Sequence, residues 1–278
     1  MEIINLVPKY IDFLHGKQSR DEYIADFPEL FEHYFAFWGH KDAPFVENKS
    51  TIHTGASLVL DNIAHIENIF SASGISLDAL RLVLFVGQNV SNGHSAYLND
   101  KWVVWIPIEL YNSKLQVDVF LTHELIHGVH YQKHPELYFA TQDEKRNLGR
   151  QIVSEGVATY ATMRLINVDQ QTALWADFLA DTEYATWCEQ YNARKTELVK
   201  FAITHWNDDA KELFQANDKR DILRFRGGYG LGLETVGAIA KDISLPALLD
   251  MDTQELHQKS LAYLKKAEPD EAPPKLRD

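Results

Sequence analysis

Two histidines and a glutamate in the middle of the chain form the pattern His-Glu-x-x-His. They are His123, Glu124 and His127. Four residues are close to one helical turn, so on a helix both imidazoles project to the same side and can share one Zn²⁺ at about 2.0–2.1 Å. Glu124 is rotated away from that pair but stays near the open position of the metal, where a general base must lie. The pattern therefore predicts one Zn²⁺ per chain, with Glu124 as the base.

A catalytic zinc site needs a third protein ligand. The metzincin pattern requires a histidine ten positions after His123, but that position holds Lys133, and neither His130 nor His134 fits. The gluzincin pattern takes a glutamate from a following helix instead. We therefore predict that Glu155 completes the metal site.

The acidic residues that follow the histidines have other possible roles. A glutamate on a helix is most often an exposed surface residue, and Glu155 stands out because it follows the histidine pattern and has Gly156 beside it. Asp143 and Glu144 also follow the histidines, but both are expected to serve the start of a helix. Thr159, one turn after Glu155, is predicted to hydrogen-bond a ligand imidazole.

A glycine-rich segment, residues 226–232, offers further groups for the site. Tyr229 is the candidate hydrogen-bond donor to an oxyanion, because the glycines around it would let its backbone approach a cleft. The alternative is that these glycines cap a helix or allow tight packing. Arg226 is a second candidate, for an oxyanion or a substrate carboxylate. His94 lies in a segment rich in turn residues and is expected at the surface.

The helices that must position these groups have sequence signals at their ends. Asp118 is expected to cap the helix of the two histidines, and Pro135 to stop it. A capping box at residues 141–144 is expected to open the next helix, which runs to about Leu165 and carries Glu155.

The rest of the pattern predicts an α+β protein that is mostly helical. Residues 80–86 and 101–108 are β-branched and aliphatic runs that predict a small antiparallel sheet of two or three strands. Pro107 is expected to place the second run at a sheet edge, because proline has no N–H for the ladder. Residues 1–70 are expected to be helical, with a capping box at residues 19–22 and a helix start at Pro28.

These elements predict a single catalytic unit over residues 1–266. It consists of a helical N-terminal part (1–75), a small sheet (76–117) and a helical lobe with the zinc site (118–266). Residues 267–278 hold three prolines among charged residues and are expected to be a flexible tail.

The composition disfavours several classes of function. The net charge of −13 repels phosphate backbones and anionic lipids, so neither nucleic acid nor membrane is an expected partner. The single cysteine, Cys188, excludes an internal disulfide and a zinc site of several thiolates. The acidic N-terminus does not resemble a secretory signal, and no apolar run approaches the roughly 20 residues of a membrane span. A cytoplasmic location is expected.

These features resemble the gluzincin clan of zinc metallopeptidases, and within it the bacterial predicted Zn-dependent proteases. Three pieces carry the resemblance: residues 123–127, Glu155-Gly-x-Ala-x-Tyr160, and Gly228-Tyr229-x-x-Gly232. They span roughly the second half of the chain. The resemblance implies a small sheet packed over the active-site helix and a helical C-terminal lobe beneath it. It also implies an edge strand, in residues 101–108 or 95–97, that holds an extended peptide by backbone pairing.

The chain departs from two better-known patterns of that clan. The thermolysin family has an aspartate one turn after its glutamate ligand, where this chain has Thr159. The Gly-x-Met-x-Asn motif of aminopeptidases is absent, so exopeptidase specificity is not implied.

The chemistry expected from the site is hydrolysis of a peptide or protein substrate by a metal-activated water. One alternative is a zinc-dependent hydrolase of another amide or ester, including a cell-wall peptide. Another is a binding module with a vestigial metal site. The presence of Glu124 argues against the module, because a site that only holds zinc does not need that carboxylate.

Overall fold

A four-stranded mixed sheet forms one layer of the computed structural model, which describes residues 1–141, 144 and 147–267. The strands are β1 (Glu2–Asn5), β2 (Leu80–Phe85), β3 (His94–Leu98) and β4 (Lys101–Pro107), in the order β1-β2-β4-β3. β3 and β4 are antiparallel, whereas β1 with β2 and β2 with β4 are parallel. The α+β class is confirmed, but antiparallel pairing holds only for β3 with β4.

Two details of the sheet differ from the prediction. Residues 2–5 form a strand, although the whole N-terminal region was expected to be helical. The strand that contains Pro107, β4, is an interior strand, because it lies between β2 and β3. Proline is tolerated there because Pro107 stands at the last position of the strand, opposite Phe85, where the ladder ends. The edge strand beside β4 is β3, which contains residues 95–97.

The N-terminal helices follow the predicted signals. They are α1 (Val7–Leu14), α2 (Arg20–Ala25), α3 (Pro28–Phe37) and α4 (Lys49–Ala72). Ser19 Oγ accepts the N–H of Glu22 at 3.2 Å and the Glu22 carboxylate accepts the N–H of Ser19 at 2.6 Å, so the capping box is confirmed. Pro28 begins α3 as expected.

Helix α5 (Lys114–Lys133) carries the two histidines. Ser113 caps it by accepting the N–H of Gln116 at 3.2 Å, so the helix begins five residues earlier than predicted. Asp118 is therefore inside the helix and pairs with Lys114. The helix ends two residues before Pro135, as predicted. It is buried on all sides, because β3 and β4 cover one face while α4 and α7 (Leu148–Leu165) pack on others.

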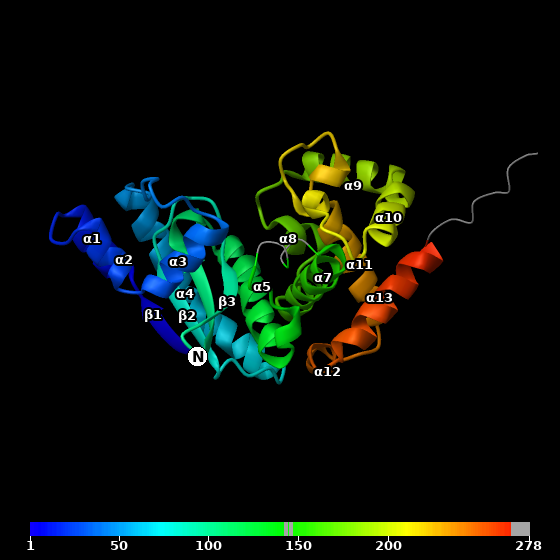
Figure 1. The fold of residues 1–278 in the computed structure, drawn as a ribbon, viewed down its shortest axis with the longest axis horizontal. Helices are drawn as coiled ribbons and strands as arrows, with labels where there is room; N and C mark the ends of the chain where they lie inside the picture. Colours follow the sequence, from blue (N-terminus) through cyan, green and yellow to red (C-terminus); the bar gives the residue numbers. More distant parts are fainter. Residues whose placement is uncertain (142–143, 145–146, 268–278) are drawn as a thin grey trace, which may run out of the picture.

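The remaining helices lie on the far side of α5 from the sheet (Figure 1). After α7 they are α8 (Gln170–Trp175), α9 (Asp181–Ala193), α10 (Lys195–Thr204), α11 (Gly227–Ile239), α12 (Leu245–Leu249) and α13 (Thr253–Ala267), with short 3₁₀ turns at Ile108–Leu110, Pro135–Leu137, Lys211–Phe214 and Ile222–Arg224. Helix α7 packs against both α5 and α11, so it connects the histidine helix to the glycine-rich segment.

Helix α7 begins later than the sequence suggested. Asn147 caps it by accepting the N–H of Arg150 at 2.9 Å, and its first residue is Leu148. The reciprocal contacts of Thr141 and Glu144 are present at 3.2 Å. Residues 142–143 and 145–146 of the predicted capping-box helix, and the tail 268–278, lie outside the described residues.

Two glycines allow α7 and α11 to approach each other closely. A Cβ on Gly156 would stand 2.5 Å from the carbonyl oxygen of Gly232, and one on Gly232 would stand 2.6 Å from that of Ile152. Backbone atoms cannot move aside without shifting a helix. The alternative that the glycine-rich segment allows tight packing is thus correct for Gly232, which Gly156 meets from α7.

Substitution at this crossing should destabilise the fold. We expect Gly232→Ala to lower the free energy of unfolding by about 1–3 kcal/mol, as overpacking of an interior does. The matched control is Gly237→Ala in the same helix, where a Cβ would meet Tyr160 at an ordinary 3.5 Å. Alanine has the higher helix propensity, so the control should be neutral or stabilising by up to about 1 kcal/mol. Urea unfolding of both variants measures the difference, and equal effects would contradict the steric explanation.

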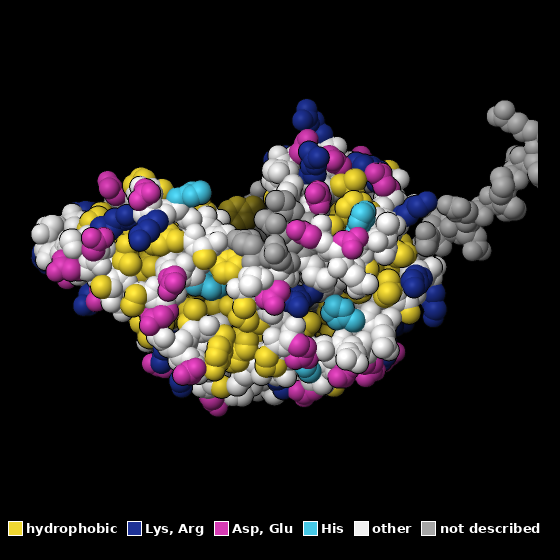
Figure 2. Space-filling model, viewed as in Figure 1, with side chains coloured by type: hydrophobic (Ala, Val, Ile, Leu, Met, Phe, Trp, Pro, Cys, Tyr) yellow, Lys and Arg dark blue, Asp and Glu magenta, His cyan; other side chains and the backbone are white. Residues whose placement is uncertain are grey.

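The surface carries no large region of one charge on the face drawn in Figure 2, where acidic and basic side chains are interspersed. The net charge of −13 is therefore not gathered on this face. Among the described residues, no helix is long and apolar enough to span a bilayer. The division into units at residues 75, 117 and 266 stays a prediction.

Candidate active site

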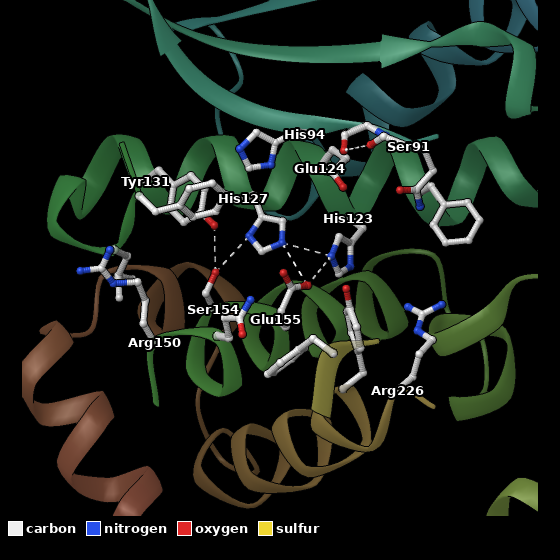
Figure 3. A pocket seen from close by; sticks show the side chains of 18 of the residues that line it. Ser91, His94, His123, Glu124, His127, Tyr131, Arg150, Ser154, Glu155 and Arg226 are labelled. Carbon is white, nitrogen blue, oxygen red and sulfur yellow. Dashed lines mark hydrogen bonds and ion pairs between the residues drawn. The ribbon is translucent and has the colours of Figure 1, made fainter. Parts of the chain in front are cut away.

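Three side chains from two helices converge on one point. His123 and His127 project from α5 and Glu155 projects from α7 toward them (Figure 3). The Nε2 atoms of the two histidines are 3.1 Å apart, and Glu155 Oε2 lies 3.1 Å from His123 Nε2 and 3.4 Å from His127 Nε2. The structure brings together the three residues predicted from the sequence, and they form a group able to hold a metal ion.

The separations of the three donor atoms match the size of a zinc ion. Ligands at about 2.0–2.1 Å in a tetrahedral arrangement stand roughly 3.3 Å from one another. The observed separations of 3.1–3.4 Å are close to that value. Two imidazoles with one carboxylate are also a donor set that catalytic zinc accepts, with a fourth position left for water or substrate. The residues present thus fit a zinc ion.

Hydrogen bonds hold the His127 ring with Nε2 facing the metal position. Ser154 Oγ lies 3.3 Å from His127 Nδ1 and 3.0 Å from the Tyr131 hydroxyl. With Nε2 as a metal ligand, Nδ1 carries the proton and donates it to Ser154, which fixes the tautomer. The prediction that Thr159 contacts a ligand imidazole is not what the structure shows: the contact comes from Ser154, one residue before Glu155.

The carboxyl groups of Glu155 and Glu124 differ in charge state. Burial tends to raise the pKa of Glu155, but the imidazoles of His127 and His123 outweigh it and hold the pKa well below its usual range. Burial raises the pKa of Glu124 to about 7, with His127 opposing the rise and Glu155 adding to it. Glu155 is thus ionised and suited to bind a cation, whereas the raised pKa of Glu124 suits that carboxyl group to accept and release a proton.

Glu124 lines the same cavity as the three donors, and its carboxyl group is held mainly by packing. Its Oε2 atom is buried and has no hydrogen-bond partner among the described residues. Residues at the start of β3 pack against Glu124. A Cβ on Gly93 would stand 2.9 Å from Glu124 Cγ, and Ser95 Oγ donates to the Glu124 carbonyl oxygen at 2.6 Å. The carboxyl group is therefore confined next to the metal position and is free to contact a bound molecule.

A cavity of about 270 Å³ opens over these residues. Its wall contains Tyr229 and Arg226, so both residues of the glycine-rich segment reach the site. Burial raises the pKa of Tyr229 above its ordinary value, which keeps its hydroxyl protonated as a donor. His94 also lines the cavity and is only 8% exposed, so the prediction of a surface histidine was wrong. It packs on Trp38 and Phe139 at ring distances of 4.5 and 5.0 Å.

Of the rival residues, Glu144 and His134 are engaged elsewhere. Glu144 is exposed and accepts the N–H groups of Ala140 and Thr141 at 2.7 and 3.2 Å, and Asp143 lies outside the described residues. His134 contacts the carbonyl oxygen of Leu249 at 3.0 Å.

Sequence reasoning missed the two residues that support His127. Tyr131 follows His127 by four positions, so the spacing i, i+4, i+8 from His123 already placed it on the same face of the helix. The rings of His127 and Tyr131 stack at 5.3 Å. Ser154 had no comparable signal, because its contact depends on how α7 is rotated against α5.

Comparison with known proteins agrees with this geometry. The model of a family described as Predicted Zn-dependent protease (DUF2268) matches residues 72–240, which is more than half of the 278 residues. The matched span contains the three converging residues, Glu124 and Tyr229. Searches of curated proteins and of solved structures found no match. The chain therefore belongs to this family of predicted Zn-dependent proteases.

Proposed function

We propose that the protein is a zinc-dependent peptidase of the gluzincin type, with His123, His127 and Glu155 as the metal ligands. The observation that carries this proposal is the convergence of three donor atoms, 3.1–3.4 Å apart, beside a buried carboxyl group with no partner among the described residues. A site that only stored or sensed zinc would not need Glu124 in that place. The family description supports the same reading.

Each side chain of the site has a separate role in hydrolysis. A zinc ion bound here supplies a Lewis acid that activates water and polarises the substrate carbonyl. Glu124 accepts a proton from the attacking water and later delivers it to the nitrogen of the leaving amine. The bond formed joins the water oxygen to the carbonyl carbon, and the bond broken is the C–N bond of the peptide. Ser154 and Tyr131 keep the His127 ring in position.

Strand β3 and Tyr229 are suited to hold the substrate and the developing charge. β3 has β4 on one side and is the last strand of the sheet, so its other side can pair with an extended peptide. Tyr229 lines the cavity with a hydroxyl that burial keeps protonated, and it is our candidate donor to the oxyanion.

Removing the Tyr229 hydroxyl should therefore slow the chemical step. We expect Tyr229→Phe to lower kcat by about 10²-fold with little change in KM, because the bond is made in the transition state. Tyr184→Phe, on α9 outside the cavity, is the matched control and should keep the wild-type kcat. Steady-state kinetics on a cleaved peptide gives both constants. A kcat for Tyr229→Phe equal to that of the control would remove Tyr229 from the mechanism.

A peptide-library digest tests the proposal as a whole. The wild-type protein, loaded with one zinc per chain, should cleave peptides, lose the activity with a chelator and regain it with zinc. Cleavage of esters or other amides but not of peptides would identify a different hydrolase with the same site. One zinc per chain without turnover of any of these substrates would identify the binding module.

A further inference from the structure

Arg226 lines the cavity of the proposed active site and lacks the partner that an arginine normally has. Each of the other arginines that the structure describes has an oxygen atom as a hydrogen-bond or ion-pair partner. For Arg226 the described residues supply none, and its Nε atom is buried without a partner. A partly buried cation that has no hydrogen-bonded counter-charge is unfavourable. Its place in the cavity wall therefore suggests that a ligand supplies the missing anion.

The guanidinium group is fixed by two aromatic rings. Arg226 Cζ lies 4.7 Å from the ring centroid of Trp175 and 4.2 Å from that of Tyr229. Contacts with ring faces leave the N–H groups at the edge of the guanidinium plane available as donors. Arg226 extends toward the metal position on the His123 side of the site (Figure 3). The group is thus held rigidly while its donors remain unused.

The backbone conformation at Arg226 and the charges around it also favour the binding of an anion. Arg226 has φ of 57°, in the left-handed region that is uncommon for residues other than glycine, and its N–H donates to Gln215 at 2.7 Å. It precedes the first turn of α11, which contains no acidic residue, so the positive end of the helix adds to its field. The carboxylate of Glu155 is engaged with the two imidazoles. With a divalent cation on those donors, this end of the cavity is positive overall.

We propose that Arg226, stacked between Trp175 and Tyr229, forms a subsite that binds a carboxylate of the peptide substrate close to the bond that is cleaved. A guanidinium edge binds a carboxylate through two parallel N–H···O bonds. This inference rests on the proposed peptidase function and specifies its substrate class. The carboxylate has two possible sources, which are the free C-terminus of the peptide and the side chain of an aspartate or glutamate. In the first case the enzyme cleaves near the C-terminal end.

A competition for binding tests the subsite without requiring turnover. The Glu124→Gln variant is loaded with zinc and immobilised. The probes are two pools of randomised N-acetylated octapeptides, and the peptides end in a free carboxyl group in one pool and in a carboxamide in the other. A second pair of pools, both amidated, carries glutamate in one and glutamine in the other. We expect one acidic pool to be retained roughly 10- to 100-fold better than its neutral counterpart, as charge-assisted hydrogen bonds allow. The pair that shows this preference identifies the source of the carboxylate.

The double variant Glu124→Gln/Arg226→Gln should reduce that preference to about one. Glu124→Gln/Arg226→Lys should keep part of it, because lysine preserves the charge but not the paired geometry. Glu124→Gln/Arg220→Gln removes an equal charge at an exposed position and should keep the full preference. Thermal unfolding with zinc shows that each variant is folded before the comparison.

The outcomes separate the subsite from the peptidase proposal. Absence of hydrolysis by the zinc-loaded wild type overturns the peptidase proposal, whereas the retention ratios still decide the subsite. Equal retention within both pairs of pools overturns the subsite. So does a preference that survives Arg226→Gln. If hydrolysis occurs and Arg226→Gln lowers kcat equally on acidic and neutral pools without changing retention, Arg226 serves the transition state instead.

Discussion

Glu155→Ala is expected to abolish tight zinc binding while leaving a folded protein. Glu155 Oε2 is the only carboxylate oxygen of the described residues in the group with His123 and His127. Loss of a residue that merely supports a ligand weakens metal affinity by about 10- to 100-fold, so loss of a ligand should raise the Kd for zinc by at least about 100-fold. Metal analysis after dialysis in a zinc buffer should give about one zinc per wild-type chain and almost none for the variant.

Zinc-induced stabilisation provides a second measurement of the same loss. A ligand that binds only the folded state stabilises it by about 2.7 kcal/mol at one hundred times its Kd. The wild type should show that gain in thermal unfolding with added zinc, and Glu155→Ala should show little at the same concentration. Glu189→Ala removes an exposed glutamate of α9 and is the matched control. Full zinc content in Glu155→Ala would mean that another donor holds the metal, and the ligand assignment would fail.

The part of the site that could be predicted from sequence is the part that one helix determines. A spacing of four residues fixes the relative direction of His123 and His127 whatever surrounds the helix. Capping by Ser19 and the start at Pro28 are likewise decided within one turn of chain. Glu155 could be predicted as a ligand candidate because a catalytic zinc site needs a third protein donor, and the next helix contains a glutamate beside a glycine.

The sheet was harder to predict because its pairing joins distant segments. β1 pairs with β2 across almost eighty residues, and neither strand carries a local signal for a parallel partner. One signal was present in the sequence and was missed. Asn99 and Asp100 connect β3 to β4 with positive φ at both residues, which is the conformation of a two-residue hairpin turn. That turn would have identified β3, and with it the position of His94 at the start of a strand.

The burial of His94 and Arg226 could not be predicted for a related reason. Each side chain lies near the end of an element, where its surroundings come from other parts of the chain. His94 is enclosed by Trp38 and Phe139, and Arg226 by Trp175 and Tyr229. Sequence patterns report the average exposure of a residue type, but a cavity is built from several elements at once.

Glu124→Gln is expected to keep zinc and lose almost all turnover. The amide has nearly the shape of the carboxyl group but cannot accept the proton of the attacking water, so kcat should fall by about 10²- to 10⁴-fold. Each factor of ten corresponds to about 1.4 kcal/mol of transition-state free energy. The fold should tolerate the change, because Glu124 Oε2 makes no hydrogen bond to the described residues that the amide would break. The measurements are kcat on a cleaved peptide and the zinc content of the same sample.

Comparison of the two glutamate variants separates the base from the ligand. If Glu124 acts only as a base, Glu124→Gln retains one zinc per chain and the zinc-induced stabilisation, whereas Glu155→Ala loses both. Glu189→Gln controls for the loss of one negative charge and should keep the wild-type kcat. Loss of zinc from Glu124→Gln would make residue 124 part of the metal site. Wild-type kcat with zinc retained would place the base elsewhere in the cavity, because removal of the acceptor from the reacting water cannot leave the rate unchanged.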